Sequence, residues 1–201
     1  MWDTYWGIIL FAIVTSGTPG PNNLMMLSSG SNFGMRRSLP HLLGISIGFP
    51  AMLLILSIGS MPILMLNPQV LSAIKIIGMC YLLYLAWRIA NSSVDDHVLE
   101  SKKIAKPLTC FQSALFQWAN PKAWIVAAGA VSTYLIPNQM LSHHMVWVVL
   151  IFVAAGFLCC GSWLLMGRHL RLLLKRPLYL RIFNYVAAGL LVCSMIPELN
   201  L

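Results

Sequence analysis

Long apolar runs separated by short polar stretches dominate this chain. Six runs, each of about 20 residues or more, cover residues 4–28, 41–66, 70–90, 109–135, 145–167 and 182–200. About 20 apolar residues in a helix are enough to cross a hydrocarbon core of about 30 Å. The pattern therefore predicts an all-α integral membrane protein with six transmembrane helices.

Two of these runs contain residues that break helices. The first includes T-P-G-P-N-N from Thr18 to Asn23, and the fourth includes Q-W-A-N-P-K-A-W from Gln117 to Trp124. Proline in a helix interior removes a hydrogen bond and costs about 3 kcal/mol. Irregular backbone at membrane depth survives only when protein buries it or when it lines a wet cavity. We therefore expect both helices to be broken at a hydrated site.

The position of the two breaks suggests an internal repeat. Pro21 and Pro121 occupy comparable places in the first run of each group of three. Three spans are an odd number, so the two groups insert in opposite orientations, as in inverted-repeat transporters. We predict a first repeat at 1–90, a cytoplasmic linker at 91–108 and a second repeat at 109–201. The alternative is that two helix prolines coincide by chance.

Composition and charge agree with a bilayer environment. The chain is 59% hydrophobic and 9% charged, whereas a soluble domain has roughly 25% charged residues. The net charge of +8 lies mostly in loops near Arg36, Lys102 and Arg171 rather than among aromatic residues, which argues against nucleic acid as a partner. The positive-inside rule places these loops in the cytoplasm and both termini outside.

Lys122 is the basic residue predicted to lie deepest in the membrane. A helix that starts at Pro21 or Pro121 presents free N–H groups and a partial positive charge, which together can hold a carboxylate. A charge at mid-membrane costs roughly 2.5–3.5 kcal/mol on the insertion scale. We expect Lys122 to face the cavity and contact a substrate anion or backbone carbonyls. A structural role at the break is the alternative.

Motifs for other chemistry are missing from the sequence. The five cysteines form no C-x-x-C pair, and the five histidines lack the spacing of metal ligands. No set of paired carboxylates, H-E-x-x-H motif or Ser-His pair suggests catalysis. We predict no enzyme activity, no metal and no cofactor. The apolar runs contain no Asp or Glu in their cores, so proton coupling would use Lys122, a tyrosine or the substrate's own charge.

Four stretches resemble the LysE/RhtB family of bacterial amino-acid exporters. They are T-P-G-P-N-N-L-M-M-L-S-S-G-S-N-F-G-M-R-R-S (18–38), L-L-G-I-S-I-G (42–48), I-K-I-I-G-M-C-Y-L-L-Y-L-A-W-R (74–88) and N-P-K-A-W (120–124). The order and length are similar to exporters of cysteine and O-acetylserine and to those of homoserine and threonine. The resemblance implies efflux of small neutral amino acids across the bacterial inner membrane, driven by proton antiport with alternating access.

An amino-acid zwitterion matches the chemistry expected at the breaks. The helix N-termini and Lys122 suit its carboxylate, and the amides and freed carbonyls suit its ammonium. The predicted substrate-binding residues are Pro19, Gly20, Pro21, Asn22, Asn23, Asn120, Pro121 and Lys122. A lipid flippase or a channel is the alternative function. Gly44-x-x-x-Gly48 can pack helices closely, either within the monomer or in a homodimer.

Overall fold

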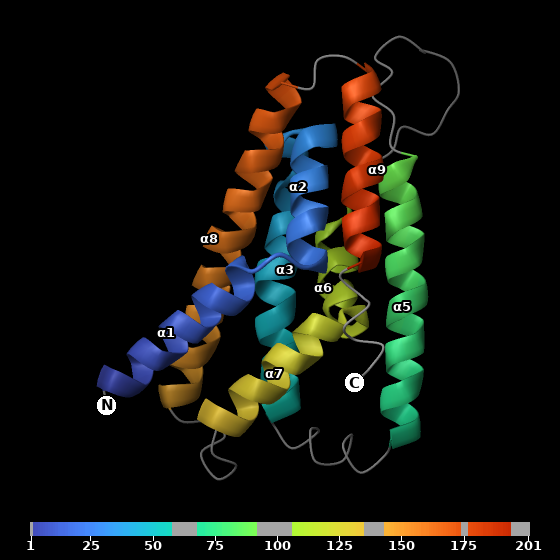
Figure 1. The fold of residues 1–201 in the computed structure, drawn as a ribbon. Helices are drawn as coiled ribbons and strands as arrows, with labels where there is room; N and C mark the ends of the chain where they lie inside the picture. The colour runs from blue at the N-terminus through green and yellow to red at the C-terminus, as the bar shows by residue number, and fades with distance from the viewer. Residues whose placement is uncertain (1, 58–67, 92–105, 135–142, 174–176, 194–201) are drawn as a thin grey trace.

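The computed structural model describes residues 2–57, 68–91, 106–134, 143–173 and 177–193. Within these ranges the chain forms eight α-helices and no strand (Figure 1). The helices are α1 (Trp2–Gly17), α2 (Pro21–Phe33), α3 (Met35–Ile55), α5 (Pro68–Ala90), α6 (Cys110–Ala119), α7 (Pro121–Tyr134), α8 (His143–Leu173) and α9 (Pro177–Cys193). The all-α expectation is therefore confirmed for the described part of the chain.

Both proline motifs interrupt the helix in which they lie. Helix α1 ends at Gly17 and α2 begins at Pro21, with Gly20 extended at φ 179° between them. Helix α6 ends at Ala119 and α7 begins at Pro121, with Asn120 in an extended conformation. Proline is favoured at the first helical position because its missing N–H would have no partner there. In Figure 1 both pairs of helices change direction at the break, near mid-height of the molecule.

The connection between α2 and α3 is much shorter than the sequence suggested. We expected the first apolar run to end near residue 28 and the second to begin near 41, but α2 continues to Phe33 and α3 starts at Met35. Gly34 alone separates them, and its φ of 76° falls in the region that favours glycine. The reversal is tight because Gly34 adopts this conformation, and it leaves Arg36 and Arg37 in the first turn of α3.

Helix α2 lies inside the bundle, between α8, α3 and α9 (Figure 1). It is unusually polar for a central helix, yet almost all of its residues are buried, including Asn23, Ser28, Ser31 and Asn32. Asn32 and Asn184 of α9 exchange two amide hydrogen bonds of 2.9 and 3.1 Å. Such paired amides are the usual way to bury polar side chains away from water.

Apolar clusters lie on either side of the breaks. One joins α1, α3, α7 and α8 around Ile8, Met52 and Phe152. A second joins α2, α5, α6 and α9 around Leu82 and Phe116. Both clusters include residues next to a break, since Ala123 of the first cluster follows Lys122 and Leu24 of the second follows Asn23.

Glycines bring several helix backbones into direct contact. A Cβ placed on Gly167 of α8 would lie 2.1 Å from the carbonyl oxygen of Leu27, and one on Gly30 would lie 2.3 Å from that of Leu164. Similarly, Gly44 and Gly48 of α3 pack against the backbone of α6. Of the two uses predicted for the Gly44-x-x-x-Gly48 motif, the structure therefore shows packing within the monomer.

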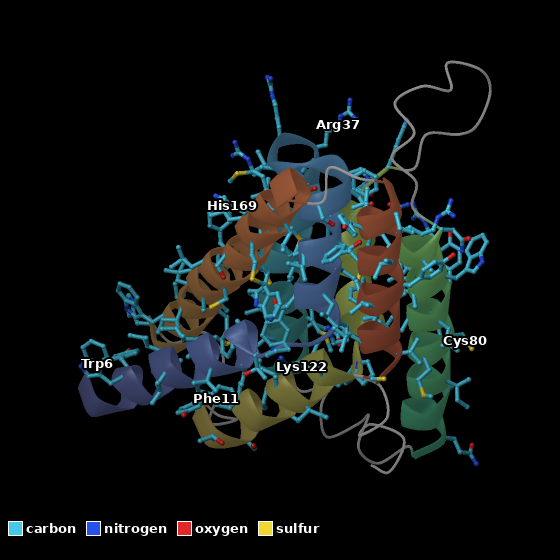
Figure 2. The ribbon with its side chains drawn as sticks, turned by 45° about the horizontal axis from the view of Figure 1, so that its top comes forward. Trp6, Phe11, Arg37, Cys80, Lys122 and His169 are labelled. Atoms are coloured by element: carbon cyan, nitrogen blue, oxygen red, sulfur yellow. The ribbon has the colours of Figure 1, made fainter. Side chains whose placement is uncertain are left out.

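The outer faces of the bundle are strongly apolar. Trp6, Ile77, Phe111 and Leu158 are each more than 60% exposed, and Trp6 and Cys80 point outward in Figure 2. Among the described helices, Met35–Ile55 and His143–Leu170 are long and apolar enough by themselves to cross a membrane. So much exposed apolar surface marks a region that contacts lipid or protein rather than water.

Some of the expected features lie outside the described residues. Positions 92–105, which make up most of the predicted cytoplasmic linker, belong to this group, as do 58–66 of the second predicted span and 194–200 of the sixth. The described ends of the neighbouring helices show only that α5 ends at Ala90 and that α6 begins at Cys110, after its capping residue Thr109.

Candidate functional site

The two helix breaks meet in one pocket. Thr15, Ser16, Asn22 and Asn23 line it from the first break, and Asn120 and Lys122 line it from the second. The N-termini of α2 and α7 both begin at this pocket, so two sets of unpaired helical N–H groups lie near the same space. In Figure 2, Lys122 lies near the centre of the bundle, close to the inner ends of α1, α2 and α7.

Lys122 connects the two breaks directly. Its Nζ donates a hydrogen bond of 2.7 Å to the backbone oxygen of Thr18, at the end of α1. Gly20 makes room for this side chain, since a Cβ at Gly20 would lie 2.8 Å from Cδ and 3.2 Å from Nζ of Lys122. An ammonium held by a freed carbonyl at a pocket wall is one of the two contacts expected for Lys122.

The amide of Asn23 holds the end of α1. Its Nδ2 donates to the backbone oxygens of Ser16 and Thr18, both at 2.8 Å, and its Oδ1 accepts from the thiol of Cys160 at 3.2 Å. Trp163 of α8 donates to the oxygen of Gly17 at 3.2 Å. These bonds replace the helical partners that the break removes, which explains how the irregular backbone is tolerated.

Asn22 is paired with a residue of the other break. Its Nδ2 donates to Oε1 of Gln117 at 2.9 Å, and Nε2 of Gln117 donates back to Oδ1 of Asn22 at 3.2 Å. Gln117 is fully buried and also donates to the oxygen of Ser113 at 3.0 Å. The pair therefore ties the first turn of α2 to the last turn of α6.

Asn120 differs from the other two amides. Its side chain is 2% exposed, and its Oδ1 has no hydrogen-bond partner among the described residues. Its backbone oxygen is used, because it accepts from the N–H of Ala123 at 2.9 Å. An unpaired buried oxygen costs about 1–3 kcal/mol, so Asn120 offers an acceptor that a donor on a bound solute would satisfy.

The rest of the pocket is apolar. Its apolar wall is formed by residues of three helices, namely Ile45, Phe49 and Pro50 of α3, Val126 of α7 and Phe152 of α8. The space between the walls amounts to about 500 Å³, measured out to its open mouth. The pocket thus combines a polar side that offers an ammonium, an amide oxygen and helix N-termini with an apolar side. This chemistry suits reversible binding of a small zwitterion with a short side chain.

Five of the eight predicted site residues line the pocket, namely Gly20, Asn22, Asn23, Asn120 and Lys122. The three prolines do not line it; Pro21 and Pro121 begin α2 and α7, and Pro19 lies in the turn before α2. Sequence reasoning did not single out Gln117 or Cys160. Gln117 lies within the quoted proline motif, where a second amide was a usable signal, whereas nothing near Cys160 marked it.

Comparison with known proteins identifies sequences similar to this chain. The family model described as "LysE type translocator" matches residues 13–194. The chain is 31% identical to the protein named "Cysteine/O-acetylserine efflux protein" of Escherichia coli strain K12, over 90% of each chain. A protein of the same name from Shigella flexneri has the same identity and coverage, and one from Escherichia coli O1:K1 is 30% identical. No solved structure matches the chain.

Proposed function

This chain belongs to the LysE type translocator family, and from that membership we propose that it exports small neutral amino acids from the cytoplasm. The family match covers both helix breaks, and it makes the protein a transporter rather than an enzyme. The observation that carries the proposal is the single pocket in which Lys122, Asn120 and the N-termini of α2 and α7 converge.

The polar side of the pocket would bind the backbone groups of the amino acid. Lys122 and the N–H groups at the start of α7 attract the carboxylate, and the unpaired Oδ1 of Asn120 accepts from the ammonium. Asn22 and Asn23 line the same side, but their amides already hold the breaks together. We therefore assign them the role of fixing the pocket's shape.

The apolar side would receive the side chain of the substrate. Phe49, Phe152 and Val126 leave room for a short chain and offer no charged partner. The relatives are named for cysteine and O-acetylserine, and both compounds have short, uncharged side chains. We propose substrates of this type, with homoserine and threonine as further candidates.

Alternating access in an inverted repeat is the mechanism we propose. In an inverted repeat, the corresponding pairs would be α1 and α6, α2 and α7, α3 and α8, and α5 and α9. Exchange of the two halves then turns the α1–α8 contact into the α3–α6 contact, and both contacts are present. It also leaves the α3–α8 and α5–α9 contacts unchanged. These pairings support two opposed halves that rock around the pocket. The α2–α8 contact does not follow the exchange, because its counterpart α3–α7 is much less extensive. In this scheme six spans cross the inner membrane, and proton antiport supplies the energy.

The first test measures efflux of a panel of labelled amino acids from cells that overexpress the protein. We expect saturable efflux of small neutral amino acids. Lys122→Met, which keeps the length of the side chain and removes its charge, should reduce efflux at least tenfold, because a hydrogen bond to a charged group contributes about 1.5–3 kcal/mol. Asn22→Ala should also impair efflux, because it breaks the pair with Gln117.

Asn32→Ala is the matched control for this experiment. It breaks a reciprocal amide pair on the same helix, but Asn32 bonds to α9 and does not line the central pocket. Its efflux per inserted protein should stay close to that of the parent. If Lys122→Met exported as well as the parent at equal membrane levels, the proposed binding site would be wrong.

A lipid flippase or a channel is the alternative function, and membership of the translocator family does not favour it. Transport in proteoliposomes separates the cases. An exporter saturates as the substrate concentration rises, whereas flux through a channel increases without saturation.

A further inference from the structure

A second pocket lies near the basic end of the bundle, apart from the central one. It is formed by α2, α3, α5 and the segment that leads into α6, and it encloses about 450 Å³ out to its open mouth. Its polar lining residues are Ser28, Ser29, His41, Arg88 and Lys106. None of these residues belongs to the substrate site described above.

Two cations lie on the rim of this basic pocket. Nη2 of Arg88, in the last turn of α5, donates a hydrogen bond of 3.0 Å to the backbone oxygen of Lys106. This bond holds the segment before α6 against α5, so the charges of Arg88 and Lys106 belong to the same opening. A guanidinium has five N–H donors, and this bond uses one of them. Among the described residues, those that line the pocket include no carboxylate to neutralise either charge.

His41 adds a buried polar atom to the pocket wall. Its side chain is 1% exposed, and its Nδ1 lies 2.8 Å from Oγ of Ser29. When the Ser29 hydroxyl donates its proton to Nδ1, the neutral ring carries its own proton on Nε2. Nε2 has no hydrogen-bond partner among the described residues. The wall therefore holds a donor that an oxygen acceptor would satisfy.

We propose that the basic pocket binds the carboxylate of a small solute through Arg88, Lys106 and the polar groups of α2 and α3. Ser29 is seven residues after Asn22 on the same helix, which is about 10 Å along its axis. The two pockets share no lining residue. A role of this pocket in the entry of exported amino acids rests on the proposed function. Anion binding by the pocket is inferred from its lining residues alone.

The test measures binding of trifluoroacetate, a small carboxylate, by ¹⁹F NMR to the purified full-length protein in phosphatidylcholine nanodiscs. Lys106→Gln and Arg88→Gln should each weaken binding roughly tenfold, because each removes one of the two positive charges at the opening and hydrogen bonds to charged groups are the stronger ones. Arg37→Gln is the matched control, because Arg37 is exposed near the same end and does not line the pocket. Lys106 is exposed, so its replacement leaves the fold intact even if Arg88→Gln does not fold.

Lys122→Met separates this site from the central pocket. Binding that persists in Lys122→Met and weakens in Lys106→Gln supports the proposal. Two results overturn it. In the first, binding weakens in Lys122→Met and is unchanged in both Lys106→Gln and Arg88→Gln. In the second, Arg37→Gln weakens binding as much as Lys106→Gln does. Because no transport is measured, failure of the efflux experiment leaves this result unaffected.

A parallel set of nanodiscs that contain phosphatidylglycerol identifies the anion. If anionic lipid displaces trifluoroacetate from the parent protein, the site is an anion site that a lipid phosphate occupies. If binding is equal in the two lipids, the site is open to small solutes. Absence of any binding in both lipids contradicts the proposal.

Discussion

At the scale of single residues, the broken backbone uses most of its polar side chains for its own support. Asn23 donates to two freed carbonyls. The amide of Asn22 donates one hydrogen bond to Gln117 and accepts another from it. Lys122 also contacts a freed carbonyl, but through a flexible side chain. Burying a polar group without a hydrogen-bond partner is costly. The backbone groups freed by the breaks therefore need partners from the protein, and fewer side chains are left to bind a solute.

Gly20→Ala tests the position of the Lys122 ammonium without changing its charge. The added Cβ would lie 2.8 Å from Cδ of Lys122, so the side chain must move away from Thr18. We expect the half-saturating concentration for efflux to rise about tenfold, as loss of one charged hydrogen bond predicts. Since Gly20 is already extended at φ 179°, alanine introduces no backbone strain.

Gly129→Ala is the control for that substitution. Its Cβ would meet Phe11 at 3.5 Å, an ordinary contact, and alanine in a helix is favoured over glycine by roughly 0.5–1 kcal/mol. Efflux by this variant should match the parent. Normal half-saturation in Gly20→Ala would show that the ammonium position does not matter for binding.

At the scale of helices, close backbone contact fixes α2 in the bundle. Gly30 and Gly167 allow α2 and α8 to touch, and Asn32 ties the far end of α2 to α9. Small residues are the usual means of such approach in membrane proteins, where no hydrophobic effect drives helices together. The start of α2, and with it one wall of the pocket, is positioned by the glycine contacts with α8 as well as by the proline motif.

Gly167→Ala should separate α2 from α8. Its Cβ would lie 2.1 Å from the backbone oxygen of Leu27, which has no side-chain freedom with which to yield. Overpacking of this kind typically destabilises a protein by about 1–3 kcal/mol. Thermal unfolding of the detergent-solubilised protein should show a lower Tm for Gly167→Ala.

Gly189→Ala provides the comparison, because a Cβ there meets nothing within 4 Å. Its Tm should equal or exceed that of the parent. Equal melting of the Gly167 and Gly189 variants would rule out the tight α2–α8 contact as a source of stability.

At the scale of the whole molecule, charge divides the two ends of the bundle. The α2–α3 junction, the end of α5 and the end of α8 lie at the same end (Figure 1). Figure 2 labels Arg37 and His169 toward this end. The start of α1, the end of α3 and the start of α8 lie at the opposite end (Figure 1). From the positive-inside rule we propose that the basic end faces the cytoplasm.

Labelling of introduced cysteines tests this orientation. In a background in which the five native cysteines are replaced by alanine, His143→Cys should react with a membrane-impermeant maleimide in intact cells. Arg37→Cys should react only after the cells are permeabilised, since three spans separate the two positions in the proposed topology. Equal labelling of both in intact cells would contradict the odd number of spans, and the reverse pattern would contradict the orientation.

The sequence by itself determined the class of protein and the places where helices break. Apolar runs can be recognised in the sequence because each residue contributes to the mean hydropathy independently of its neighbours in space. The prolines at 19, 21 and 121 interrupt helices by local sterics, so the starts of α2 and α7 follow from the chain alone. Four stretches, the first of which begins with T-P-G-P-N-N, also carried the family resemblance that the family match then confirmed.

Only the tertiary structure decided what each polar group at the breaks does. The amides at 22, 23 and 120 have different roles. Asn22 bonds to Gln117 and Asn23 bonds to Ser16 and Thr18. By contrast, Oδ1 of Asn120 has no hydrogen-bond partner among the described residues. The basic pocket could not be predicted from the sequence either, because Arg88 and Lys106 are 18 residues apart and His41 lies on a third segment. Hydrogen-bond partners and cavities depend on distances between distant segments, and a linear pattern carries no such distances.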